Sequence, residues 1–251
     1  MDLTQALLLG AVQGITEWLP ISSEGANSLI LTQIYHVPFK DAIVLSLWLH
    51  LGTLLAALIY FRKEIVTLIK KRDETWTFLL VSTIVSLIVS APFVFFGIER
   101  VSFNGKSAMI VIGFLLLITG LLQLLMRKRS ITEKQPTVRD AIVLGIGQGL
   151  AILPGISRSG TTIALLLWRN HSPQNAIRLS FLMSIPAVVI ASGWAFLKGG
   201  TIVTTTSLLG VATAFVVGLL TIAGLLKVAE KINFGWFCIL MGLLSIIAGF
   251  V

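Results

Sequence analysis

The chain has 251 residues, of which 56% are hydrophobic and 12% are charged, and its mean hydropathy is +0.96. Soluble domains carry about 25% charged residues, so this chain has too few charges to cover a surface that faces water. In a chain of this composition, the net charge of +8 is better explained by loops that lie against anionic lipid than by nucleic-acid binding. We therefore expect an all-α integral membrane protein, with membrane lipids and no nucleic acid among its partners.

Apolar segments follow one another along the chain in two similar sets. The first set opens with two short apolar pieces, separated by a polar break, at about 5–35. Three longer runs follow, at about 42–61, 77–97 and 107–126. A basic linker at 127–138 leads to a second paired segment at about 139–168, followed by runs at about 176–197, 206–226 and 233–251. The longer runs approach the roughly 20 residues that a helix needs to cross a bilayer.

The two sets are similar in sequence, which indicates an internal duplication. The segment "ALLLGAVQG" at 6–14 aligns with "AIVLGIGQG" at 141–149, and "AIVLS" at 42–46 aligns with "AIRLS" at 176–180. Between these matches, a Leu-Pro pair, a serine and a glycine recur at nearly the same offset. We therefore predict two repeats, 1–126 and 139–251.

Each repeat begins with a short pair of apolar pieces around a polar break, a pattern that predicts a re-entrant helical hairpin. Non-helical backbone at membrane depth is tolerated where protein or a wet cavity satisfies it. Matching interruptions in two repeats mark a binding site at their interface. A hairpin returns to its own side, so each repeat crosses the membrane three times. The second repeat must then be inverted relative to the first.

The basic residues support this topology, because they fall mostly on one predicted side. The opposite side has only Lys40, Arg100, Lys106 and Lys198, and Arg158 lies within the second hairpin. The basic side carries Arg62, Lys63, Lys70, Lys71, Arg72, Arg127, Lys128, Arg129, Lys134, Arg139, Arg169, Arg178, Lys227 and Lys231. Cytoplasmic loops are enriched in Lys and Arg, so we predict a multi-pass plasma-membrane protein with both termini outside.

Ionisable side chains inside apolar membrane segments are costly and mark candidate functional positions. Glu17 and Glu24 lie in the first break, "QGITEWLPISSEG" at 13–25, and Arg158 lies in the second, "LPGISRSGTT" at 153–162. In the inverted arrangement the two breaks meet near the middle of the membrane, so we expect Arg158 to approach both glutamates. His50, on a predicted spanning helix, is a weaker fourth candidate.

The breaks are also rich in groups that bind phosphate. Hydroxyls donate hydrogen bonds, glycines permit tight turns, and a turn that leads into a helix presents free N–H groups to an anion. The planar fork of an arginine suits phosphate oxygens. We predict a phosphate- or pyrophosphate-binding site formed by Ser22, Gly25, Ser157, Arg158, Ser159, Gly160, Thr161 and Thr162. Gln13 and Gln148, which are equivalent in the two repeats, either line this site or bond helices to one another.

Each charged candidate also has a purely structural explanation. Arg158 could form an ion pair with Glu24 that holds the two hairpins together. Glu17 could form a hydrogen bond with the backbone or an ion pair with an arginine. His50 could be a packed or hydrogen-bonded residue of its helix. His171 falls in a loop near a proline, where we expect it to be solvated.

The two breaks resemble the two signature motifs of the undecaprenyl-pyrophosphate phosphatase family, of the bacitracin-resistance type. The resemblance covers most of the chain, including the three runs that follow each break. The second motif matches at Pro154, Gly155, Ser157, Arg158, Ser159, Gly160 and Thr162, and the first at Gly14, Thr16, Glu17, Leu19, Pro20, Ser22, Ser23 and Gly25. The resemblance implies a membrane hydrolase of inverted repeats, supported by a divalent cation and open to the outer face. Its activity would be removal of the terminal phosphate from a polyprenyl pyrophosphate.

The first motif departs from the family pattern at two positions. Ala26 stands where the pattern has a histidine implicated in catalysis, and Glu24 replaces the usual serine or threonine. This variant is similar to archaeal members, for which a dolichyl carrier would replace the undecaprenyl one. The missing histidine leaves the nucleophile open.

A mechanism can be written with the residues that remain. Arg158 and the neighbouring hydroxyls would hold the pyrophosphate, while Glu17 and Glu24 would hold a Mg²⁺ or Ca²⁺ ion. Ser23 or a water molecule would attack, with Glu17 as general base, and Glu24 could take the proton-transfer role of the histidine. The product would be the monophosphate carrier, recycled for cell-wall or glycan synthesis.

A second function is also compatible with the sequence. Inverted repeats with broken helices are a transporter architecture, so the chain could instead move polyprenyl phosphate lipids across the membrane without cleaving them. Phosphate release separates the two hypotheses. The sequence leaves the oligomeric state open, with a homodimer as one option.

Overall fold

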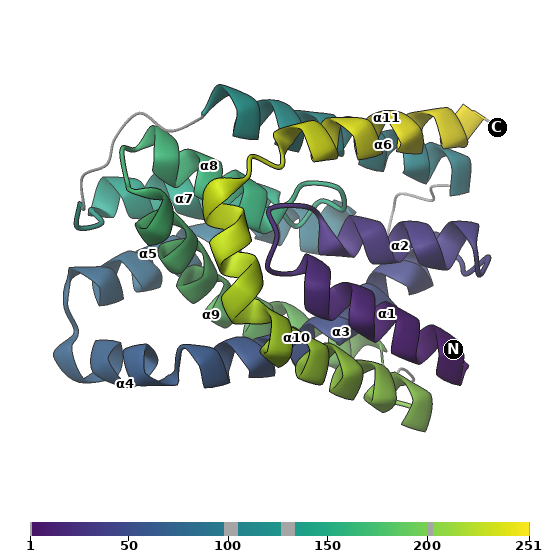
Figure 1. Ribbon diagram of the computed structural model, residues 1–251, viewed down its shortest axis with the longest axis horizontal. Coiled ribbons are helices and arrows are strands. Elements are labelled where there is room, and N and C mark those ends of the chain that lie inside the picture. Colours follow the sequence, from purple (N-terminus) through teal and green to yellow (C-terminus); the bar gives the residue numbers. More distant parts are fainter. Residues whose placement is uncertain (1, 98–104, 127–133, 200–202, 251) are drawn as a thin grey trace.

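The computed structural model describes residues 2–97, 105–126, 134–199 and 203–250, which form helices without any strand (Figure 1). The all-α class is therefore confirmed. The α-helices are α1 Leu3–Thr16, α2 Ser23–Gln33, α3 Phe39–Tyr60, α4 Arg62–Lys71, α5 Glu74–Pro92, α6 Gly105–Leu125, α7 Val138–Leu150, α8 Arg158–Trp168, α9 Pro173–Gly199, α10 Thr205–Lys231 and α11 Gly235–Phe250. A π-helical turn, η1 Phe93–Gly97, extends α5.

Within the described residues, five helices are long and apolar enough to cross a membrane. They are α3, α5, α6, α9 and α10, and together with the apolar composition they make the chain a multi-pass membrane protein. The sixth predicted span, 233–251, corresponds to α11, which has only 16 residues and packs along α6. The six-span count therefore stays a prediction.

The two short helix pairs, α1–α2 and α7–α8, are built alike. In the first pair the Ser22 side chain caps α2 by accepting a hydrogen bond from the Gly25 N–H, at 3.1 Å. In the second, the Ser157 side chain caps α8 by accepting from the Gly160 N–H, at 3.0 Å. These caps satisfy backbone donors that have no partner within the helix. Each polar break thus ends on a serine that starts the next helix.

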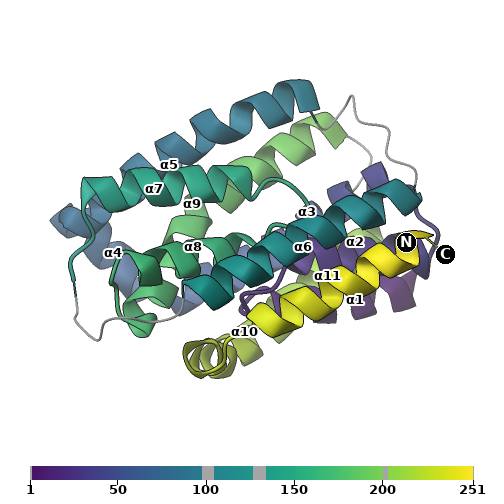
Figure 2. The ribbon, with the colours of Figure 1, turned by 90° about the horizontal axis from the view of Figure 1, so that it is seen from above.

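Glycines let the first helix of each pair approach a long helix from the other half of the chain. A Cβ atom on Gly10 of α1 would lie 2.4 Å from the Gly210 carbonyl oxygen of α10. A Cβ atom on Gly145 of α7 would lie 2.7 Å from the Ser82 carbonyl oxygen of α5. Small residues at such positions allow backbones of membrane helices to pack closely. Each half of the chain therefore packs its first short helix against a long helix of the other half: α1 packs against α10, and α7 packs against α5 (Figure 2).

Helix α4 was not predicted from the apolar pattern, because it is short and amphipathic rather than apolar throughout. It carries basic residues at both ends and buries Leu68, and it ends at Arg72 in a left-handed conformation. Both views place α4 at the end of the molecule opposite to the N- and C-termini (Figures 1 and 2).

Part of the sequence-based topology falls on residues that the structure does not describe. Residues 127–133 of the predicted linker lie outside the described residues. The same holds for four of the basic residues counted above, namely Arg100, Arg127, Lys128 and Arg129.

Candidate functional site

The polar turns after α1 and α7 meet inside the protein. The Ser159 hydroxyl, in the first turn of α8, donates to the Leu19 carbonyl at 3.1 Å. Helix α6 bonds both turns: Gln123 Nε2 donates to the Pro20 carbonyl at 2.7 Å, and Thr119 Oγ1 accepts from the Ser157 N–H at 3.2 Å. The charged end of α1 and the N-terminus of α8 are thereby held against each other.

Arg158 and Glu17 form an ion pair across this contact. Arg158 Nη2 donates to Glu17 Oε1, and the guanidinium carbon lies 5.7 Å from the centre of the Phe181 ring. The Arg158 Nη1 atom is buried and has no hydrogen-bond partner among the described residues. The expected approach of Arg158 to Glu17 is confirmed, and the partner of the arginine is Glu17 rather than Glu24. One nitrogen of the guanidinium remains available to a ligand.

Ser23 lies between a carboxylate and an imidazole. Its hydroxyl donates to Glu17 Oε2 at 2.8 Å and lies 3.5 Å from His50 Nε2, which is itself 3.3 Å from the same carboxylate oxygen. His50 Nδ1 is 2.8 Å from the Ser46 carbonyl, which can only accept, so Nδ1 carries a proton. The other ring nitrogen, Nε2, therefore faces Ser23 and Glu17.

His50 has a larger part in the site than its position in the sequence indicates. The available signal was an ionisable residue on a spanning helix, but periodicity alone could not show which face of α3 meets the hairpins. In the structure, His50 faces Ser23, whose hydroxyl also contacts Glu17.

The amide side chains of Gln13 and Asn27 form a hydrogen-bonded chain that ends at the Glu17 carboxylate. Gln13 Nε2 donates to Glu17 Oε2 at 3.1 Å, and Asn27 Nδ2 donates to Gln13 Oε1 at 2.8 Å. Both amide side chains are fully buried. Gln13 thus belongs to the site, whereas its repeat equivalent Gln148 donates to Ser86 of α5 at 3.3 Å and bonds helices together.

These side chains surround a small cavity of about 40 Å³. It is lined by Glu17, Ile21, Ser22, Ser23, Glu24, His50, Ala151, Ile156, Arg158 and Ser159. Glu24 faces this cavity, and none of the described basic residues forms an ion pair with it. Carboxylate oxygens are the ligands that Mg²⁺ and Ca²⁺ prefer. The pair Glu17 and Glu24 therefore fits a divalent cation in its donor chemistry.

Several predicted phosphate ligands do not line the cavity. Thr162 Oγ1 bonds the Arg158 carbonyl at 2.8 Å and Ser180 of α9 at 2.7 Å, while the Thr161 methyl group lies against Gly147 of α7. Successive residues of α8 point in different directions, so only Arg158 and Ser159 of this run reach the cavity. The remaining three have structural roles at the turns. Gly25 and Ser157 take part in the caps described above. Gly160 lies close to α6, because a Cβ atom there would be 2.7 Å from Gln123 Nε2.

A second cluster of charges lies at the other end of α7. Asp140 is fully buried, accepts from Arg169 Nε at 2.6 Å and caps α7 through Thr137. His171, which we expected to be solvated, is 1% exposed and lies 3.5 Å from Asp140. That expectation was wrong because the loop after α8 folds back onto the start of α7.

The chain is similar to known proteins along its whole length. A family model described as "Bacitracin resistance protein BacA" matches residues 6–247. A protein of Methanococcoides burtonii named undecaprenyl-diphosphatase is 42% identical over 100% of both chains. Relatives with the same name from Methanothrix thermoacetophila and Methanopyrus kandleri are 36% and 37% identical, and the alignments cover 98% and 96% of this chain and 96% and 94% of theirs.

Proposed function

Because the chain belongs to the bacitracin resistance protein BacA family, we propose that it is a membrane phosphatase that hydrolyses a polyprenyl pyrophosphate. The products are the polyprenyl monophosphate and inorganic phosphate, which recycles the lipid carrier. One observation carries this function: a serine hydroxyl, bonded to a buried glutamate and facing a histidine, lies beside an arginine with an unpartnered nitrogen.

Arg158 is the group that binds the pyrophosphate. Its guanidinium is held at the cavity by Glu17 and the Phe181 ring, and Nη1 is free to donate. An arginine binds two phosphate oxygens with parallel hydrogen bonds, which fixes the orientation of the group as well as its position. Ser22 and Ser159 line the same cavity, and the Ser22 hydroxyl, which accepts from the Gly25 N–H, can donate to a phosphate oxygen.

Ser23 is the nucleophile of this proposal. When phosphate oxygens bind Arg158, the positive charge of the arginine stabilises the Glu17 carboxylate less. Glu17 can then accept a proton more readily. Ser23 Oγ then attacks the terminal phosphorus, its proton passes to Glu17, and the bond from this phosphorus to the bridging oxygen breaks. The polyprenyl monophosphate leaves, and a water molecule cleaves the phosphoserine to release phosphate.

His50 supplies an imidazole to this site, although the family-pattern histidine is replaced by Ala26. The Ser46 carbonyl accepts from Nδ1 and so holds the ring with Nε2 facing the Ser23 hydroxyl and Glu17. In this position it orients Ser23 for attack.

A divalent cation completes the proposed site, with Glu24 and Glu17 as its protein ligands. Bound there, Mg²⁺ or Ca²⁺ would neutralise charge that develops on the phosphate oxygens. We also place both termini and the opening of the site on the outer face, since the basic residues of α4 lie at the opposite end.

The test is phosphate release from undecaprenyl pyrophosphate by the purified protein in detergent, with Mg²⁺ or with EDTA. We expect metal-dependent release, a loss of roughly 10²–10⁴-fold in kcat for Glu17→Gln, and loss of substrate binding for Arg158→Ala. Arg139→Ala and Glu230→Gln change the same residue types outside the cavity and should keep full activity. If the lipid binds through Arg158 but no phosphate is released, the hydrolase is refuted and a carrier explains the site better.

A further inference from the structure

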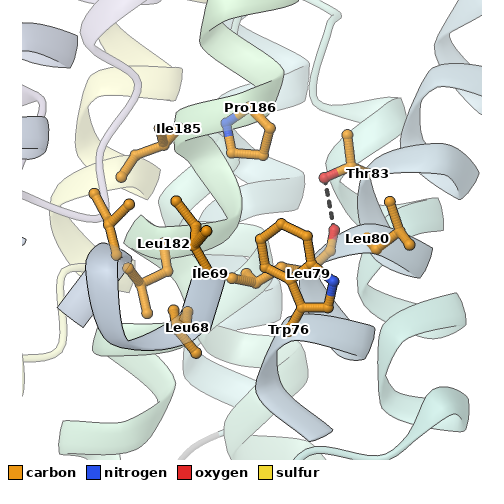
Figure 3. Close-up of a pocket in the computed structure, with 10 residues that line it drawn as sticks. Leu68, Ile69, Trp76, Leu79, Leu80, Thr83, Leu182, Ile185 and Pro186 are labelled. Carbon is orange, nitrogen blue, oxygen red and sulfur yellow. Dashed lines mark hydrogen bonds between the residues drawn. The ribbon is translucent and has the colours of Figure 1, made fainter. Parts of the chain in front are cut away.

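A second cavity, of about 250 Å³, lies between α4, α5 and α9 (Figure 3). Ile69 of α4, Trp76 and Leu79 of α5, and Leu182 and Pro186 of α9 contribute to its wall. The one hydroxyl in this wall, that of Thr83, already donates to the Leu79 carbonyl at 2.7 Å. None of the wall residues lines the polar cavity. Apart from the indole N–H of Trp76 the wall is apolar, so the second cavity can accept an apolar chain.

The helix at the rim of this cavity is basic. Ile69 contributes to the wall, and the next three residues, Lys70, Lys71 and Arg72, are exposed and positively charged. Arg62 and Lys63 add two more exposed positive charges at the start of the same helix. A short amphipathic helix with an apolar side and a basic side is suited to the boundary between headgroups and acyl chains.

Three acidic residues lie in this helix or directly after it, namely Glu64, Asp73 and Glu74. Glu64 pairs with Arg178 of α9, and the Asp73 side chain caps α5 by accepting from the Trp76 N–H at 3.1 Å. Asp73 and Glu74 keep their charges, but they are outnumbered by five basic residues, so the field beside the cavity is positive; these are Arg62, Lys63, Lys70, Lys71 and Arg72. Trp76 is half-buried near the start of α5, a position typical of tryptophan at a membrane interface.

We propose that this cavity is a binding site for one anionic membrane lipid. Its apolar chain would occupy the cavity between α4, α5 and α9, and its headgroup would lie on the basic residues of α4. Charge complementarity selects the anionic headgroup, and clusters of four or more basic residues next to a membrane helix are typical of anionic-lipid recognition. The site is independent of the phosphatase proposed above.

Trp76 reports occupancy of the cavity directly. The protein is reconstituted in phosphatidylcholine vesicles that contain a small fraction of phosphatidylglycerol or phosphatidylcholine brominated on the acyl chains. The contribution of Trp76 is the difference in quenching between the wild type and Trp76→Phe. We expect the brominated phosphatidylglycerol to quench Trp76 at least about twofold more than the zwitterionic lipid, with the difference shrinking as salt is raised.

A matched pair of variants tests the role of α4. Lys70→Gln combined with Lys71→Gln should abolish the preference for the anionic lipid. Lys227→Gln combined with Lys231→Gln removes the same charge near the end of α10 and should leave the preference intact. All four lysines are surface residues at helix ends, so folding is expected to survive.

Two outcomes would overturn the proposal. Equal quenching by the two brominated lipids would show an ordinary lipid contact without selection. Relief of Trp76 quenching by polyprenyl pyrophosphate, without any preference for phosphatidylglycerol, would assign the cavity to the substrate chain instead.

Discussion

Glu17 joins the binding and reacting groups of the proposed site. One of its oxygens bonds Arg158, and the other accepts from Ser23 and Gln13 and faces His50. Buried carboxylates are tolerated when they are paired and hydrogen-bonded in this way. Because of this arrangement, a ligand that binds Arg158 weakens its ion pair with Glu17 and so changes how strongly Glu17 attracts the Ser23 proton. Binding and activation of the nucleophile are thus linked through one side chain.

Replacement of Ser23 by alanine tests the nucleophile. We expect Ser23→Ala to lose several orders of magnitude in kcat, because no other hydroxyl is bonded to Glu17 in the described structure, while lipid binding through Arg158 is kept. The control is Ser28→Ala on the same helix, a fully buried serine that does not line the cavity. Single-turnover phosphate release measures the difference. Substantial activity in Ser23→Ala would mean that water attacks directly.

Charged residues of the site were the easiest to predict, because Glu17 and Arg158 interrupt apolar segments where a charge is costly. The orientation of uncharged hydroxyls was much harder to predict. Thr161 and Thr162 share the motif with Arg158, yet their directions depend on the packing of α8 against α7 and α9. A short polar motif specifies composition, whereas the neighbouring helices decide which of its side chains face the cavity.

At the level of elements, the contacts of α1 with α10 and of α7 with α5 depend on glycine. A methyl group on Gly10 would meet the Gly210 carbonyl oxygen and Thr213 at 2.4 and 2.8 Å. We expect Gly10→Ala to lower stability by about 1–3 kcal/mol, since both neighbours are packed atoms that cannot move aside freely. Gly224→Ala in α10 is the control, because a Cβ there meets nothing within 4 Å. Thermal unfolding in detergent should separate the two; equal midpoints would contradict the packing argument.

The Asp140 cluster holds the start of α7 to the loop between α8 and α9. Burial opposes ionisation of Asp140, but hydrogen bonds from Thr137 and Arg169 outweigh it and hold the pKa of Asp140 well below its usual range. For His171, burial is the main effect and lowers the pKa of the imidazole, although Asp140 partly opposes this. The folded state therefore favours a charged aspartate and a neutral histidine.

These pKa shifts predict an acid-sensitive fold. Both groups bind protons more weakly when folded than when unfolded, so their stabilisation is present at higher pH and is lost as the pH falls. The loss begins below the ordinary histidine pKa of 6.5 and deepens below the ordinary aspartate pKa of 3.8. We expect the unfolding midpoint to fall between about pH 7.5 and about pH 5, and to fall less in His171→Gln. His36→Gln, in an exposed loop, should behave as the wild type.

The long apolar helices followed from hydropathy, and their observed bounds lie within a few residues of the runs in the sequence. Helix α4 did not, because ten residues with charges at both ends resemble a loop between spans. Its placement depends on tertiary contacts, such as buried Leu68 and the ion pair of Glu64 with Arg178. Amphipathic elements at a membrane surface lack the length that makes spanning helices easy to recognise.

At the scale of the whole molecule, α3 separates Lys40 from the basic helix α4. The predicted orientation places Lys40 outside and Lys71 in the cytoplasm. In intact cells, we therefore expect a membrane-impermeant maleimide to label Lys40→Cys and not Lys71→Cys, with both labelled after lysis. The native Cys238 is fully buried and provides the unlabelled background. The reverse pattern would invert the topology and move the site to the inner face.

The contact of α1 with α10 also determines when the molecule can be completed during its synthesis. Gly10 packs on Gly210, which the ribosome adds 200 residues later. At about 5–20 residues per second, α1 waits for roughly 10–40 s before its partner exists. Arg158 follows Glu17 by 141 residues, so during the earlier part of that interval the nascent chain lacks the ion-pair partner of this carboxylate. The N-terminal helix therefore reaches its final packing late in translation, after all the groups of the candidate site have been made.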